Sequence, residues 1–193
     1  MKILDNINHT VREDLQDTMQ KGSRVSIAAA CFSIYAYQEL KKQLEEIAEL
    51  RFIFTSPNFV QENTPKERRE FYIPKLTREK SLYGTEFEVR LRNELTQKAL
   101  AKECADWVQR KVKFRSNVSG EQMPGFMTVG ESSYMPISGF TTVDLGCERG
   151  NNAYYPVQRT EAFENGRYFL SLFDEIWNDS SRLQDVTDIV LQS

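Results

Sequence analysis

The sequence has a single histidine, His9, among 193 residues, and this scarcity excludes much catalytic chemistry. A histidine-rich metal site is impossible, and any serine–histidine or cysteine–histidine machinery would have to use His9, which lies in the polar start of the chain. The sequence also lacks the glycine motifs that hold nucleotide phosphates in P-loop and dinucleotide-binding proteins. Enzymes of these classes are therefore poor interpretations of the sequence.

Cysteines and long apolar runs are also scarce. The three cysteines form no CxxC pair, and their odd number fits a reduced, cytoplasmic setting better than a disulfide framework. No apolar run approaches the ~20 residues that a membrane-spanning helix needs, and the first residues lack the apolar core of a signal peptide. We therefore expect a cytoplasmic protein with no membrane partner and no cofactor.

The composition is that of a folded protein, with 40% hydrophobic and 27% charged residues and a formal net charge of −3. A chain of this length buries roughly 70% of its unfolded surface, which is enough for one sizeable core. Residues 57–95 are polar and charged and interrupt the apolar pattern. We therefore expect one domain over residues 1–193, with an insertion at 57–95.

The first part of the chain has the pattern of a β-α-β unit. Residues 10–22 predict a short amphipathic helix, and the continuous apolar run 25–32 is typical of a buried central strand. Apolar residues spaced by three and four over 37–47 predict a helix of about three turns, and 50–55 predict a second strand. A strand, a helix and a strand within ~30 residues indicate a parallel sheet with a right-handed crossover.

A helix and a strand follow the insertion. Thr96 is a candidate N-cap for a helix that should end near Arg110. Residues 112–115 alternate between apolar and basic side chains, which predicts a half-exposed strand.

The last third of the chain alternates short strands with helical segments. Two short strands flank Gly130, and residues 154–157 predict another, which Pro156 favours placing at an edge of the sheet. Residues 163–177 have a strong apolar helical face. The chain ends within the apolar run 189–191, which fits either a fragment of a longer protein or a plain terminal helix.

Several conspicuous side chains are best explained by packing. Trp107 and Trp177 lie on apolar helix faces, so core packing is favoured over base stacking. Cys104 shares such a face, and Cys31 ends an apolar strand, so both are expected to be structural thiols. Cys147, in a glycine-flanked loop, is the one thiol expected to be exposed, and no activating partner is evident.

Charge is unevenly distributed along the chain. Residues 51–115 contain 15 Lys and Arg against 9 Asp and Glu, whereas the remainder contains 10 against 19. Tyr72, Tyr83 and Phe87 interleave with the basic residues, and such a stretch can follow a phosphate backbone and stack exposed bases. An ordinary solvated face, in which Arg and Glu pair with one another, explains the same pattern.

The candidate nucleic-acid contacts are basic residues of the insertion and of the strand that follows the next helix. They are Arg68, Arg69, Lys75, Arg78, Lys80, Arg90, Arg92, Lys111, Lys113 and Arg115.

Two parts of the chain resemble a known domain family. Residues 12–55 have the helix, strand, helix, strand order of the first half of a phospholipase D-like (HKD superfamily) domain. Residues 136–146 are similar to the GSxNFT turn and GLG that follow the family's HxKxxxxD motif, although Gly139 stands at the Asn position. The matching residues are Phe140, Thr141, Leu145 and Gly146. The resemblance implies an α/β fold with a central mixed, mainly parallel sheet flanked by helices on both faces.

The same register puts the family's catalytic positions on residues without catalytic chemistry. Gln122 stands at the His position, Pro124 at the Lys position and Val129 at the Asp position. In the family, one His attacks phosphorus, a second His protonates the leaving group and the Lys stabilises the phosphate charge. Residues 116–146 contain no His or Lys, so no shift of register restores the motif. The resemblance therefore implies a domain that is not an enzyme.

A narrower resemblance involves two more segments. Residues 103–112 and 169–180, the latter followed by 185–187, are similar to parts of phospholipase D-like domains at the N-terminus of large bacterial Swi/Snf-type (DEAD/DEAH-like) helicases, including anti-phage ones. In such proteins the ATP-dependent motor follows further along the chain. The resemblance therefore implies that a helicase motor domain in the same parent chain is a partner of this one.

Three functions follow from these observations. The first is a catalytically inactive domain that binds nucleic acid as an accessory of a bacterial DNA/RNA helicase. The second is a homodimerisation or partner-docking module without nucleic-acid binding, for which the apolar loop 123–127 suits a contact surface. The third, an active phosphodiesterase, requires a nucleophile that the motif positions do not supply.

Overall fold

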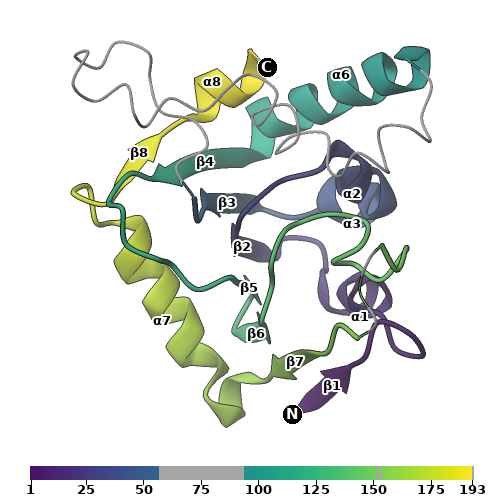
Figure 1. Ribbon diagram of the computed structural model, residues 1–193, viewed down its shortest axis with the longest axis vertical. Helices are drawn as coiled ribbons and strands as arrows, with labels where there is room; N and C mark the ends of the chain where they lie inside the picture. Colours follow the sequence, from purple (N-terminus) through teal and green to yellow (C-terminus); the bar gives the residue numbers. More distant parts are fainter. Residues whose placement is uncertain (57–93, 151, 153, 193) are drawn as a thin grey trace.

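The computed structural model describes residues 1–56, 94–150, 152 and 154–192. Within these ranges eight strands form one sheet, in the order β1-β7-β6-β5-β2-β3-β4-β8 (Figure 1). Strands β2 (Arg24–Ala29), β3 (Glu49–Phe54) and β4 (Val112–Asn117) are parallel neighbours. These strands confirm the β-α-β interpretation of the early sequence.

The rest of the sheet is antiparallel. Strand β5 (Phe126–Val129) pairs with β2, and β6 (Ser132–Met135) and β7 (Val157–Thr160) follow it outward. The sheet is therefore mixed, as expected, but the prediction that it is mainly parallel is wrong, because five of the seven pairings among the described strands are antiparallel. Gly130, with a φ of 58°, turns β5 directly into β6, and so short a connection joins only antiparallel strands.

The two edge strands are the elements that the sequence did not predict. Strand β1 (Lys2–Leu4) pairs with β7, and β8 (Leu183–Asp185) pairs with β4. The prediction of β7 as an edge strand is therefore wrong. Pro156 is compatible with this inner position because it immediately precedes the first residue of β7.

Helices cover both faces of the sheet, as expected. One face packs against α1 (Val11–Thr18), α2 (Ile34–Glu39), α3 (Lys41–Leu44), α6 (Glu94–Lys111) and α8 (Thr187–Leu191). The other face packs against α7 (Gly166–Trp177), which follows a short 3-10 turn, η2 (Ala162–Glu164). Figure 1 shows α7 on one side of the strands and α1, α2 and α3 on the other. Among the helices described, none is both long and apolar enough to cross a membrane.

Three helix boundaries differ from or refine the predictions. Thr10 caps α1, since its hydroxyl accepts the Glu13 N–H at 3.1 Å. Helix α6 begins at Glu94, so Thr96 lies inside it and is not its N-cap. The single helix predicted over 37–47 is divided at Leu40, where a φ of −116° leaves the helical region. Of the predicted insertion, residues 57–93 lie outside the described residues.

Aromatic rings fill the larger part of the core. The Phe32 ring lies 5.3–5.5 Å, centroid to centroid, from the rings of Phe52, Phe114 and Phe140 and 6.4 Å from Trp107. Trp107 is fully buried, and its indole N–H donates to the carbonyl of Leu44 at 2.9 Å. The prediction that Trp107 packs in the core is confirmed.

The smaller part of the core, under α7, combines apolar and cationic side chains. Trp177 is buried and stacks on Phe173. The Arg51 guanidinium lies 4.9 Å from the Phe173 ring centroid and pairs with Asp174 at 2.7 Å, and Arg115 lies 4.1 Å from the Trp177 ring. Cations on aromatic faces therefore help to hold α7 against the sheet.

We expect Phe32→Ala to lower the free energy of unfolding by about 3–5 kcal/mol, because it leaves a cavity among four aromatic rings. Urea denaturation followed by circular dichroism measures the loss. The matched control is Phe163→Ala, at a residue that is 87% exposed, which should change stability by less than about 0.5 kcal/mol. Equal losses in the two variants would contradict this description of the core.

Candidate functional site

A cavity of about 770 Å³ opens beyond the carboxyl end of β2. From β2 the chain adds β3 and β4 on one side and later β5, β6 and β7 on the other, so the order of the strands reverses at β2. In open α/β sheets, ligands bind outside the carboxyl ends of strands at such a switch point. We call it the switch-point cavity; residues 30–31, after β2, and residues between 138 and 155 line it.

One wall of the switch-point cavity is held by backbone hydrogen bonds. The Ala30 N–H donates to the Ser138 carbonyl at 2.8 Å, and the Phe140 N–H donates to the Cys31 carbonyl at 2.8 Å. The Ser33 N–H then donates to the Phe140 carbonyl at 2.9 Å. The segment that resembles the family's turn therefore continues the backbone pairing beside the end of β2.

Asp144 organises the loop that forms this wall. Its carboxylate is buried and accepts the Thr141 hydroxyl at 2.7 Å, the Thr141 N–H at 3.2 Å and the Tyr155 hydroxyl. Burial raises the pKa of Asp144, although these hydrogen bonds act in the opposite direction. Burial and the neighbouring Asp144 carboxylate also raise the pKa of Tyr155. Both groups hold the loop in shape.

Gly139 has no room for a side chain. A Cβ at this position would lie 2.6 Å from the Cys31 sulfur and 2.9 Å from the Asp144 Oδ2 atom. The register that matches residues 136–146 to the family's turn puts an asparagine here. The close approach of Cys31 and Asp144 thus explains physically why this loop carries glycine.

The positions that the resemblance aligns with the family's catalytic motif lie on and before β5. Gln122 and Pro124 are exposed and precede the strand, and its first residue, Phe126, pairs with Ala28 near the carboxyl end of β2. Val129 is buried at the other end of β5. The absence of catalytic activity at these positions remains a prediction.

Most apolar side chains of the loop 123–127 pack against other parts of the molecule. Phe126 and Met127 are buried within β5, and Met123 packs against the cluster under α7. Pro124 is exposed. This segment therefore offers less apolar contact surface than a docking or dimerisation site on it would need.

The burial of the cysteines agrees with the prediction for Cys104 but not for Cys147. Cys104 is buried, and desolvation raises its pKa to about 12, which confirms a structural role. Cys31 and Cys147 are both half-buried, so the expectation that Cys147 alone is exposed is wrong. Cys31 follows the last residue of β2 and lines the switch-point cavity.

Three of the basic candidate residues lie within the described ranges. The Lys111 ammonium donates to the carbonyls of Glu45 and Ile47, the latter at 2.7 Å, and Arg115 packs on Trp177 and donates to its carbonyl. Lys113 is exposed. The contacts of Lys111 and Arg115 are thus intramolecular. The other seven candidates, Arg68, Arg69, Lys75, Arg78, Lys80, Arg90 and Arg92, lie outside the described residues.

Several other cations of the described surface are paired with carboxylates. The pairs are Arg24–Glu49, Lys41–Glu103, Arg110–Glu45, Arg167–Glu131 and Arg182–Glu121. Mixed signs of this kind produce a weak net field, so these residues do not form a basic patch.

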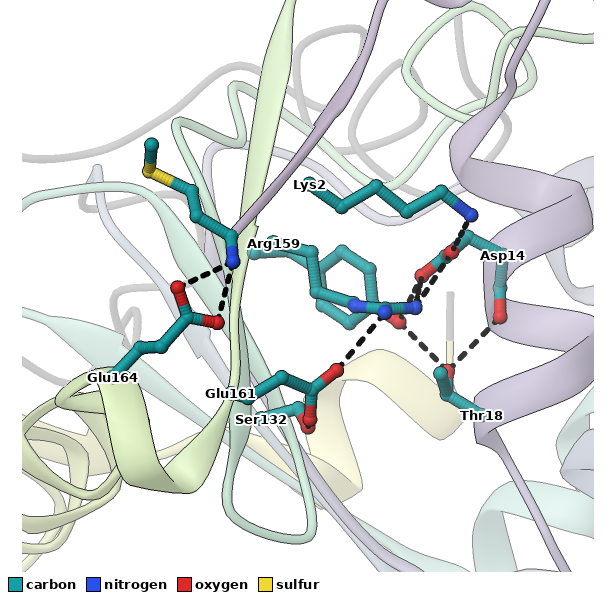
Figure 2. Close-up of polar contacts among 9 residues, drawn as sticks. Lys2, Asp14, Thr18, Ser132, Arg159, Glu161 and Glu164 are labelled. Atoms are coloured by element: carbon teal, nitrogen blue, oxygen red, sulfur yellow. Dashed lines mark hydrogen bonds and ion pairs between the residues drawn. The ribbon is translucent and has the colours of Figure 1, made fainter.

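A second polar cluster, which the sequence analysis missed, joins residues near the N-terminus to residues 132–164 (Figure 2). The buried carboxylate of Asp14 accepts the Tyr134 hydroxyl at 2.7 Å, the Lys2 ammonium at 3.0 Å and the Arg159 guanidinium at 2.8 Å. Arg159 also pairs with Glu161 at 2.9 Å. The cluster therefore ties α1 to β1, β6 and β7.

Hydrogen bonding determines the charge state of Asp14. Burial raises its pKa, but the bonds from Tyr134, Lys2 and Arg159 outweigh that effect and leave the pKa below its usual value. The partners lie up to 145 residues away in the sequence, so no local motif marks this site. The Asp14 carboxylate is satisfied by three donors, although the buried Arg159 Nε atom has no hydrogen-bond partner among the residues described; such a network of mutual bonds is typical of a structural site.

No group of three or more His, Cys, Asp or Glu side chains suited to a metal ion occurs among the residues described. No family model matches the sequence, and a comparison with curated proteins finds no similar sequence. The site must therefore be interpreted from its own geometry.

We expect Asp14→Asn to lower the free energy of unfolding at pH 7 by about 3 kcal/mol, because it leaves Arg159 and Lys2 without their buried partner. Because the carboxyl pKa is lower in the folded state, the charged form stabilises the fold above its ordinary pKa of about 3.9. That contribution is lost as the pH falls through the folded-state pKa. Urea unfolding at several pH values should therefore show that the free energy of unfolding falls less steeply toward acid pH in the variant than in the parent protein. We call this acid part of the pH profile the acid limb.

The matched control for Asp14 is Asp17→Asn, at an exposed residue of the same helix. It should retain both the stability and the acid limb of the parent protein. An acid limb in Asp14→Asn as steep as in the parent protein would contradict the role assigned to this carboxylate.

Proposed function

We propose that this chain is a non-catalytic, phospholipase D-like domain that binds nucleic acid as an accessory of a bacterial DNA/RNA helicase. Basic residues of segment 57–93, together with Lys113, contact phosphates in this proposal. The mixed α/β sheet with helices on both faces supports it at the level of fold class. The helicase motor in the parent chain rests on the sequence resemblance alone.

The observation that carries the proposal is the place where the basic segment joins the sheet. The chain leaves β3 at its carboxyl end, where Asn117 donates to the Thr55 carbonyl at 2.9 Å and Ser116 donates to the Ser56 carbonyl at 3.3 Å. This is the edge beyond which the switch-point cavity lies. The segment with eight Lys and Arg therefore follows in the chain directly after residues that lie at the edge where sheets of this type bind ligands.

Charge argues for a polyanionic ligand. Several cations of the described surface are already paired, and Lys111 and Arg115 are used in packing. The basic residues at 68–92 then supply the positive charge for a phosphate backbone, a contact that is independent of sequence and sensitive to salt. Gln122, Pro124 and Val129 supply no nucleophile, so binding without hydrolysis is the expected outcome.

The test is fluorescence anisotropy with labelled single- and double-stranded DNA at low and physiological salt. We expect affinity to fall steeply as salt rises. Replacing Arg68, Arg69, Lys75 and Arg78 together by Gln should lower the salt slope by about 3, because each phosphate contact contributes roughly 0.7–0.9.

The matched control replaces four exposed basic residues elsewhere, Lys21, Arg24, Lys42 and Arg167, by Gln. It changes the net charge equally and should bind like the parent protein. If both variants lose the same affinity for DNA, net charge alone explains the loss. If the parent protein does not bind DNA at low salt, the proposal is rejected. In that case sedimentation at micromolar concentration decides whether the domain is a homodimer.

A further inference from the structure

We infer that the switch-point cavity receives an unpaired base, preferably cytosine, from a single-stranded nucleic acid. This inference rests on the proposed function and specifies its ligand. It uses residues that the sequence analysis did not assign to binding: Glu148, Tyr154 and Ser138.

The cavity is large enough to admit a base, and its wall is preformed. Its volume of about 770 Å³ lies within the roughly 300–1,000 Å³ of small-molecule sites. Its wall is fixed by the backbone bonds of residues 138–140 and by the Asp144 hydrogen bonds. A preformed wall lowers the entropic cost of binding.

The charges on the wall select the base over the phosphate. Two carboxylates, Asp144 and Glu148, line the cavity, and a phosphate inside it would be repelled. The exposed Arg149 lies on the same wall and suits a phosphate at the mouth. A ligand with hydrogen-bond donors on its edge therefore enters, and its backbone remains outside.

Glu148 has acceptor capacity for such a ligand. It is half-buried, and its Oε2 atom accepts the Thr142 hydroxyl at 3.2 Å. A carboxylate offers about four acceptor sites, so this bond leaves others for a ligand. Carboxylates accept the N4 amino group of cytosine, whereas thymine presents a carbonyl oxygen at the equivalent position.

An exposed aromatic ring stands next to the cavity residues. Tyr154 is 84% exposed and lies in the chain between Asn152 and Tyr155, both of which line the cavity. Bases stack on exposed aromatic rings without regard to sequence. Tyr154 therefore suits a neighbouring base of the same strand.

The first test measures anisotropy with labelled oligo(dC), oligo(dT) and a duplex of equal length. We expect oligo(dC) to bind at least threefold more tightly than oligo(dT), and Glu148→Gln to abolish that difference. Tyr154→Ala should weaken single-strand binding roughly tenfold, and Ser138→Phe, which fills the mouth, should weaken it similarly.

The tyrosine and serine variants each have a control of the same chemistry on α7. Tyr168→Ala removes an equally aromatic residue that is 61% exposed, and Ser171→Phe adds the same bulk at an exposed serine. Both should bind like the parent protein. If the four-residue basic variant loses binding while the cavity variants retain it, the proposed function stands and the base site is overturned.

A second test does not need the basic segment. In a Cys147→Ser background, iodoacetamide labels the half-buried Cys31 at the cavity wall, whereas the buried Cys104 stays unlabelled. Millimolar cytidine should slow labelling of Cys31 several-fold, and uridine should slow it less. If cytidine protects Cys31 but no oligonucleotide binds, the base site is supported and the phosphate-binding role of the basic segment is rejected. If cytidine does not protect Cys31 and oligo(dC) binds no more tightly than oligo(dT), the inference is overturned.

Discussion

Strand β2 is paired on both sides and covered on both faces, and the arrangement of the rest of the molecule depends on this. All of its residues from Val25 to Ala29 are buried. The side chains that it buries, those of residues 25–29, are small or β-branched, as is typical of a strand covered on both faces. The parallel strands grow from one side of β2 and the antiparallel strands from the other. Because its two neighbours run in opposite directions, space is left beyond the carboxyl end of β2, and the candidate site lies in this space.

Local patterns sufficed to predict the elements that are buried by their own side chains. Strands β2 and β3 and helix α7 belong to this group, as does the core position of Trp107. The three-residue edge strands were not predictable, because pairing with distant partners forms them and their own pattern is too short. The directions of β5, β6 and β7 depended on connection lengths that hydrophobic periodicity does not encode.

The same distinction applies to the sites. The turn at 138–146 has a recognisable sequence, and the structure puts it on the wall of the switch-point cavity. The side-chain partners of Asp14 come from three strands, β1, β6 and β7, so they meet only because these strands are neighbours in the sheet. Arg115 was predicted to contact phosphate because the sequence shows its charge but not the side chains around it. In the fold its guanidinium lies on the indole ring of Trp177.

The two tryptophans of the chain lie in different layers of the core. Trp107 is enclosed by phenylalanine and tyrosine rings and donates to a backbone carbonyl, whereas Trp177 lies against the guanidinium of Arg115. Their fluorescence therefore originates in two chemically distinct surroundings, one apolar and one cationic. Substituting either indole by phenylalanine leaves only the emission of the other. The emission of the remaining tryptophan then reports when water enters the part of the core on its own face of the sheet.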